Sequence, residues 1–175
     1  MRKALLLAGA LALATIQARA ESVLLSNTPV VQNAAYSASN AMGGWQNFAL
    51  FSGAVRSGGI INYVAAISKG GSTTAMTVYA FSRSSGNLSS TCTDKSAFSL
   101  ANADLPYLLP GFPVTLTPAA TQGTTVSSAS QAIVVSAANY DAARTPNVAV
   151  CVVAGGSVTP ASVSDLIFNI AVLRD

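Results

Sequence analysis

The stretch Asn147-Val-Ala-Val-Cys-Val-Val-Ala154 is a short apolar run rich in valine, and the pair Gly155-Gly156 follows it directly. Runs of about four to eight β-branched or aromatic residues, bounded by turn-forming residues, are typical of β-strands. The same pattern recurs along the chain, with Gly, Ser, Thr, Asn and Pro between the runs. Strands are therefore expected at 44–51, 60–68, 74–82, 132–138, 147–154 and 166–173, and from weaker patterns at 22–25, 29–32 and 112–117.

Residues 74–82 differ from a strand with one face in water, because apolar or aromatic side chains alternate onto both faces. This pattern favours a strand that is buried on both sides. Residues 99–109 contain Pro106 and are expected to form only a turn or two of helix. Residues 118–131 are rich in Thr, Ser and Ala and are expected to form a long polar loop. Turns are expected at the glycine pairs 43–44, 58–59, 70–71 and 155–156.

These patterns predict an all-β fold. Apolar residues make up 51% of the chain and charged residues 9%, a composition that favours folding over disorder. A chain of 175 residues is expected to form one domain around one core. The expected architecture is a single β-sandwich of eight or nine strands, of jelly-roll type, with an immunoglobulin-like sandwich as the alternative.

The first 20 residues have the features of a secretory signal peptide. Arg2 and Lys3 form a basic start, residues 4–16 are apolar, and Ala18-Arg19-Ala20 provides a small-x-small cleavage pattern. The apolar stretch is shorter than the roughly 20 residues that cross a bilayer, although a retained membrane anchor is the alternative. We therefore expect residues 1–20 to be removed and residues 21–175 to form the domain. The expected location is secreted or cell-surface/periplasmic, with a virion surface as the alternative and no membrane association after cleavage.

The net positive charge of the chain belongs to the signal segment. Of 9 Lys and Arg residues, Arg2, Lys3 and Arg19 lie in it, which leaves six basic residues against 6 Asp and Glu. Binding to nucleic acid requires clustered basic residues, and the remaining ones are scattered singly, so no nucleic-acid partner is expected. Low net charge favours association, and the expected partners are further copies of the chain or a larger protein assembly.

The two cysteines, Cys92 and Cys151, are expected to form a disulfide, because an exported chain meets an oxidising compartment. The alternative is that Cys151 is a small buried apolar residue within the run 148–153.

The chain lacks the usual catalytic groups. It contains no histidine, which removes the commonest general base and metal ligand, and no nucleophile or phosphate-binding motif is present. We expect no catalytic residue, no cofactor and no metal. Asp94 and Asp104 are expected to lie in a turn and a helix start and to bond nearby backbone amides. The other carboxylates after Glu21 are Asp141, Asp165 and Asp175, without the spacing of a calcium loop.

The aromatic residues Trp45, Phe48 and Phe51 could suggest a sugar-binding platform. On a strand, however, Trp45 and Phe51 share one face while Phe48 points to the other. Packing in the core is therefore the expected role of Trp45.

From about Asn33 to Asp175, the chain resembles a group of small tailed-phage structural proteins. The resemblance is carried by Ala35-Tyr36-Ser37-Ala38, Gly43-Gly44, Arg56 with Gly58-Gly59-Ile60-Ile61, and Val78-Tyr79-Ala80-Phe81. It continues through Thr93-Asp94-Lys95-Ser96-Ala97-Phe98-Ser99-Leu100, Ala103-Asp104-Leu105, Ser164-Asp165-Leu166 and Leu173-Arg174-Asp175. The resemblance implies a β-sandwich virion component that decorates the head, and it implies no catalytic residue. The signal and the cysteines differ from a protein assembled in the cytoplasm and indicate an extracellular or cell-surface assembly.

The expected function is that of an exported, non-catalytic structural module that self-associates or coats a larger extracellular or virion assembly. The alternative is a secreted ligand-binding or adhesive module, for example for glycans, that uses loops such as residues 118–131.

Overall fold

Nine strands form in the described part of the chain, which in this computed structural model comprises residues 21–49, 58–70, 74–116, 125–129, 133–136 and 147–174. The longest of them follow the short β-branched runs that turn-forming residues separate. The strands are β1 (Glu21–Asn27), β2 (Gln46–Ala49), β3 (Gly58–Ser68), β4 (Met76–Phe81), β5 (Val114–Leu116), β6 (Thr125–Ala129), β7 (Ile133–Ser136), β8 (Asn147–Ala154) and β9 (Leu166–Arg174). Two short 3-10 helices, η1 (Ser85–Asn87) and η2 (Asn102–Tyr107), lie between β4 and β5.

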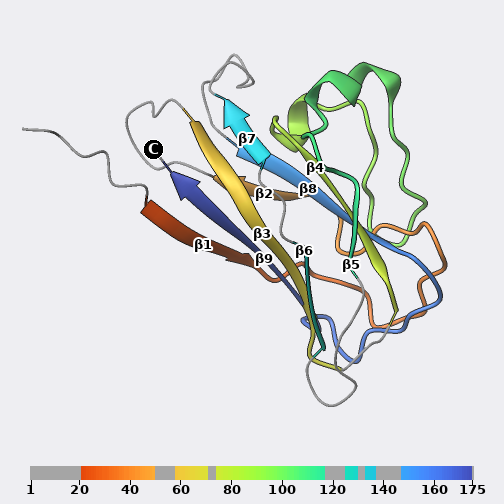
Figure 1. The fold of residues 1–175 in the computed structure, drawn as a ribbon. Coiled ribbons are helices and arrows are strands. Elements are labelled where there is room, and N and C mark those ends of the chain that lie inside the picture. Colours follow the sequence, from red (N-terminus) through yellow and green to blue (C-terminus); the bar gives the residue numbers. More distant parts are fainter. Residues whose placement is uncertain are drawn as a thin grey trace, which may run out of the picture.

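The strands form two antiparallel sheets, so the prediction of an all-β sandwich is confirmed (Figure 1). Sheet A has the order β1-β9-β3-β6, and β7 also pairs with β3. Sheet B has the order β2-β8-β4-β5. Figure 1 shows β9 between β1 and β3, with β1 at the outer side of its sheet. No helix in the described ranges is long and apolar enough to cross a membrane.

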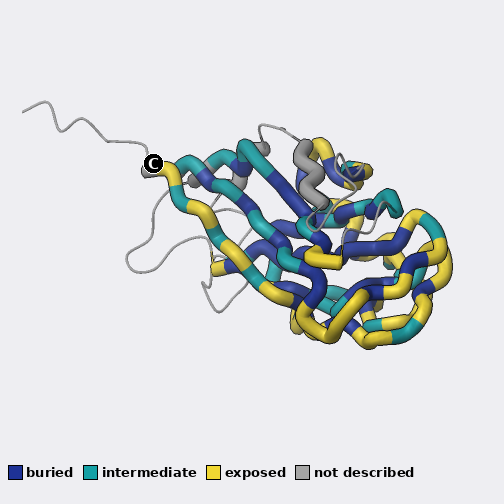
Figure 2. Tube along the Cα trace, turned by 90° about the horizontal axis from the view of Figure 1, so that it is seen from below, coloured by how far each residue is buried: buried dark blue, intermediate teal, exposed yellow. Residues whose placement is uncertain are grey.

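The main core lies between the two sheets. Alternate residues of β9 are fully or almost fully buried, as the period of two in a strand requires. Sheet B contributes buried valines from β4 and β8, and Phe48 of β2 packs on Phe168 of β9 with 6.0 Å between the ring centroids. Figure 2 shows dark blue, buried stretches inside the molecule and yellow, exposed stretches around its outside. The core residues of β9 are Leu166, Phe168, Ile170 and Val172.

Strand β8 is buried on both faces. Every residue from Val148 to Ala154 is buried, because β8 is central in sheet B and its outer face is covered by a long connection and by the segment before β2. This connection, residues 82–113, joins β4 to β5 and carries η1 and η2. The neighbouring β4 is expected to be buried on both sides. Its residues are all buried or half-buried, which confirms this expectation.

The helix prediction is also confirmed, since η2 occupies Asn102–Tyr107 and contains Pro106. Proline lacks an N–H donor, which limits this segment to about two short turns.

Three local predictions are wrong. Residues 29–32 form no strand: Pro29 has no N–H to donate, and the Val31 N–H bonds the carbonyl of Val163 instead (3.0 Å). Within the expected loop 118–131, residues 125–129 form β6, because the 11-residue β3 supplies backbone partners that outweigh weak local propensity. The pair Gly58-Gly59 begins β3 and pairs with β7 rather than forming a turn.

Candidate functional site

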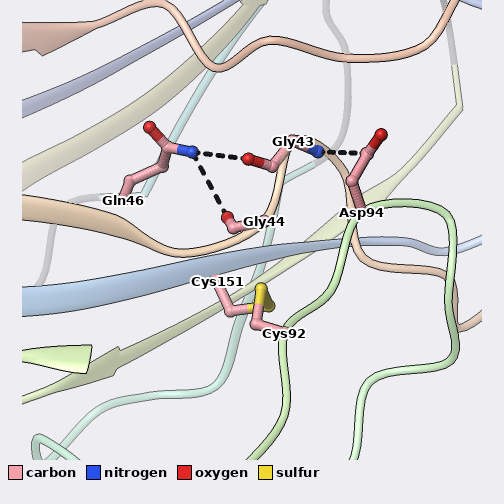
Figure 3. Close-up of a disulfide and its surroundings, with 6 residues drawn as sticks. All are labelled: Gly43, Gly44, Gln46, Cys92, Asp94 and Cys151. Atoms are coloured by element: carbon pink, nitrogen blue, oxygen red, sulfur yellow. Dashed lines mark hydrogen bonds between the residues drawn. A yellow bond between two sulfur atoms is a disulfide. The ribbon is translucent and has the colours of Figure 1, made fainter. Parts of the chain in front are cut away.

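Cys92 and Cys151 form a disulfide, which confirms the predicted pairing. The two residues are 59 apart in the sequence, and their Cα atoms are 6.1 Å apart. Cys151 lies on β8, whereas Cys92 lies in the connection between β4 and β5. The disulfide therefore fixes this connection to the outer face of sheet B (Figure 3).

A small second core surrounds the disulfide. Trp45 contacts Phe81 and Phe98 in edge-to-face geometry, with ring centroids 5.7 and 6.3 Å apart. Phe98 also lies 4.5 Å from Tyr79 of β4. The expected packing role of Trp45 is thus confirmed, although it belongs to this cluster and Phe48 belongs to the main core. Residue 51 lies outside the described ranges. The cluster consists of Ala41, Cys92, Cys151 and Val153, with Trp45, Tyr79 and Phe98 packed against it.

Asp94 connects segments that are far apart in the sequence. Its Oδ1 accepts hydrogen bonds from the Tyr36 hydroxyl (2.7 Å) and from the Gly43 N–H (2.6 Å). The Tyr36 hydroxyl in turn accepts a bond from the Gln32 N–H at 2.7 Å. The amide that Asp94 bonds is 51 residues away, so its partners differ from the nearby amides that a turn residue would bond.

The Tyr36 side chain is fully buried at this point. Burial and the hydrogen bond to Asp94 raise the pKa of Tyr36 far above its ordinary value. The phenol therefore stays neutral and remains a hydrogen-bond donor throughout the physiological pH range. The backbone of Gly43 is also constrained, because its φ of +75° is in the left-handed region and a Cβ atom there would clash with Cβ of Pro29.

Gln46 extends this arrangement to sheet A. Its side-chain NH₂ donates to the carbonyls of Gly43 (2.9 Å) and Gly44 (3.3 Å), as Figure 3 shows. Its Oε1 accepts a bond from the side chain of Asn27, at the end of β1, at 2.6 Å. We call Tyr36, Gly43, Gln46 and Asp94, with Gln32 and Asn27, the Asp94 network. It holds the start of β2, the end of β1 and the loop after Cys92 together.

Asp104 lies in the first turn of η2, as expected, but its carboxylate reaches back 14 residues. Its Oδ2 accepts bonds from the Ser90 N–H and hydroxyl, both at 2.5 Å. Burial alone would raise the pKa of Asp104, yet the bonds from Ser90 and Ser89 and the positive charge of Arg83 together hold that pKa below its ordinary value. The guanidinium of Arg83 itself stacks on the ring of Tyr107.

Asp165 holds the turn that follows β3. Its Oδ2 accepts a bond from the Ser68 hydroxyl (3.0 Å), and its Oδ1 accepts one from the Gly70 N–H (2.5 Å). The Asp165 carbonyl also accepts the Lys69 N–H at 2.9 Å. The carboxylate is buried and joins the end of β3 to the start of β9.

These three aspartates hold loops in place. Each uses carboxylate oxygens to accept hydrogen bonds from backbone amides and hydroxyls of distant segments. Within the described ranges, no group of three or more His, Cys, Asp or Glu side chains is placed to hold a metal ion. Asp141 and Asp175 lie outside those ranges, and the side chain of Glu21 is not described.

The free edge of sheet A is a different kind of candidate site. Among the described strands, β1 pairs with β9 alone and is the terminal strand of the sheet order. Its residues alternate, with Ser22, Leu24 and Ser26 exposed and the intervening side chains half-buried. Leu24 is 62% exposed, and Leu25 packs against the main core. An exposed strand edge offers backbone donors and acceptors to another chain.

Comparison with protein-family models, with curated proteins and with solved structures finds no match for the chain.

Proposed function

We propose that the chain is an exported, non-catalytic structural module that self-associates or coats a larger extracellular or virion assembly. The observation that carries this proposal is the β1 edge of sheet A, where a large apolar side chain, Leu24, is exposed and no strand of the described ranges pairs on the outer side. Natural edge strands are usually protected by lysine, proline or a bulge. β1 contains no lysine or proline, and its register with β9 is regular over all its residues.

The state of the described aspartates supports a structural role. A catalytic carboxylate needs access to a substrate and a suitable partner group. Asp104 and Asp165 are 2% and 3% exposed, and their described partners are backbone amides and serine hydroxyls within the fold. These contacts favour loop anchoring as the function of the two carboxylates.

Export is the second part of the proposal. The proposed cleavage after Ala20 would leave β1 (Glu21–Asn27) in the processed protein. A disulfide is typical of proteins that fold in an oxidising compartment. Intact mass measurement of the secreted protein tests this step: the expected mass is that of residues 21–175, and a protein that retains residues 1–20 would contradict it.

The sheet order also supports a jelly-roll as the type of sandwich. Counting β6 and β7 as one interrupted strand, since both pair with β3, the chain alternates between the sheets from β1 to β4 and again from β5 to β9. A jelly roll consists of eight strands in two sheets. An immunoglobulin-like sandwich instead keeps its first two strands in one sheet.

Light scattering and electron microscopy of the purified, processed protein test the assembly. We expect species larger than the monomer, and we expect their size to change little between about 0.05 and 0.5 M salt, because few ion pairs are available to be screened. A protein that stays monomeric at high concentration would contradict self-association. Binding of such a monomer in a glycan array would instead favour an adhesive module.

Hydrolase assays provide the test of the non-catalytic part. Activity that is present in the wild-type protein and lost in Asp94→Asn or Asp104→Asn would show that a carboxylate has a catalytic role. We expect no such activity in either the wild-type protein or these variants.

A further inference from the structure

β1 is the longest free edge in the described part of the fold. It has 7 residues, whereas the other terminal strands β2, β5, β6 and β7 have 4, 3, 5 and 4. β2 is in addition connected to the η1 segment, because the side chain of Asn47 exchanges two hydrogen bonds with Ser85 (2.8 and 2.9 Å). β5 directly follows Pro113. The edge at β1 is therefore the best suited to accept another strand.

The order of residues in β1 is self-complementary. When two β1 strands are placed antiparallel and centred on Leu24, each apolar residue lies opposite an apolar residue of the other copy, and each polar residue lies opposite a polar one. No pair of like charges results, because Glu21 is the only charged residue of the strand. The pairs are Leu24 with Leu24, Val23 with Leu25, Ser22 with Ser26 and Glu21 with Asn27.

The neighbouring strands extend this match into the sheet. Leu24 lies beside Ala171 of β9, which lies beside Tyr63 of β3. In the next row, Ser26 lies beside Asn169 and Ala65. None of these side chains is charged. A second copy at the β1 edge would therefore meet no charge repulsion from these two rows.

We propose that two copies of the chain join edge to edge through β1, by antiparallel backbone pairing centred on Leu24. This inference rests on the proposed self-association and assigns it to one strand and one register. The pairing is two-fold symmetric, so that sheet A of one copy continues into sheet A of the other. Such a dimer can be the unit from which a larger assembly forms.

Charge substitution at Leu24 tests the register. Its side chain is 62% exposed, so a polar residue there is compatible with the fold. In Leu24→Lys, two lysines would face each other, as would two glutamates in Leu24→Glu, and like charges directly opposite destabilise a strand pair. Each variant alone should dissociate with a dissociation constant raised by at least about tenfold. An equimolar mixture of the two should form the heterodimer again.

Leu105→Lys is the matched control. It introduces the same change at another exposed leucine (48%), on η2 and away from β1 in Figure 1. We expect it to associate like the wild-type protein. Far-UV circular dichroism and thermal melts of all variants establish that they are folded.

A cysteine cross-link provides a second measurement. Directly opposed residues in an antiparallel pair have Cα atoms about 4.5–5.5 Å apart, which is within the range that a disulfide can span. Leu24→Cys should therefore form a covalent dimer under mild oxidation, and Leu105→Cys should not.

The outcomes separate this inference from the proposed function. If wild-type protein is monomeric, the β1 interface and the proposed self-association are both wrong, and only the coating of another assembly stands. If wild-type protein assembles and Leu24→Lys assembles equally well, the β1 interface is wrong and self-association stands. If both charge variants dissociate but their mixture does not associate again, or if Leu24→Cys forms no cross-link, the pairing centred on Leu24 is overturned.

Discussion

Removal of the disulfide should cost the protein about 4 kcal/mol of stability. The bridge closes a loop between residues 59 apart, and in the chain-entropy model a cross-link of this span lowers the entropy of the unfolded chain by roughly 14 cal/mol/K. At 25 °C this corresponds to about 4 kcal/mol in the free energy of unfolding. For a chain of this size, each kcal/mol shifts the melting temperature by about 2–4 °C, so the expected loss is about 8–16 °C.

The variant Cys92→Ala/Cys151→Ala and chemical reduction of the wild-type protein should be compared. Both cysteines are buried, at 4% and 0% exposure, so the alanine variant also loses packing around the missing sulfur atoms. Reduction keeps both sulfur atoms and removes only the cross-link. The loss in the double variant should therefore equal or exceed the loss on reduction.

Urea titration provides the assay, and Trp45 provides the probe. It is the single tryptophan of the chain and packs in the cluster around the disulfide. Its fluorescence should report the same transition as far-UV circular dichroism if unfolding is two-state. A double variant that unfolds within about 1 kcal/mol of the wild-type protein would refute the cross-link as a main source of stability.

Three further substitutions test the contacts of the loops. The free energy of unfolding should fall as the pH drops below about 4, because the folded state holds the pKa of Asp104 below its unfolded value. In urea titrations, Asp104→Asn should flatten this pH dependence, and a variant with the pH dependence of the wild-type protein would contradict the role of Asp104. Gly43→Ala should lower the free energy of unfolding by at least about 1–2 kcal/mol, because Gly43 has a left-handed backbone and the added Cβ would clash with Pro29. Gly86→Ala, where the added Cβ meets open space, should leave the free energy of unfolding nearly unchanged in the same assay. Tyr36→Phe should lower the free energy of unfolding by about 1–3 kcal/mol, because the Gln32 N–H and the Asp94 carboxylate would lose their hydrogen bonds to the hydroxyl. A variant as stable as the wild-type protein would show that these hydrogen bonds do not stabilise the fold.

The strands of the sandwich could be predicted because their information is local. β8 follows its valine run from Asn147 to Ala154, and β9 and β3 follow similar runs. β6 could not be predicted, since Thr125–Ala129 has a polar sequence and becomes a strand through its pairing with β3. Residues 29–32 show the reverse case, in which an apolar pattern around a proline forms no strand.

The loop contacts could not be predicted, because their partners lie far apart in the sequence. Tyr36 and Asp94 are 58 residues apart, and Ser68 and Asp165 are 97 apart. No spacing signal relates such pairs in one sequence. The disulfide was predictable because the chain has only two cysteines. Elsewhere, the types of residue indicated turns, whereas the fold determined which segments the turns would join.

Several acidic side chains of this protein make hydrogen bonds within the fold, and this favours association between copies. The composition indicates a domain with little charge. In addition, Asp104 and Asp165 are buried, and Asp94 accepts hydrogen bonds from Tyr36 and Gly43. Half of the six acidic residues of the chain therefore hold loops in place. Fewer acidic groups remain to repel another copy than composition suggests. At the β1 edge, where Leu24 is exposed, backbone pairing and apolar contact meet little electrostatic opposition.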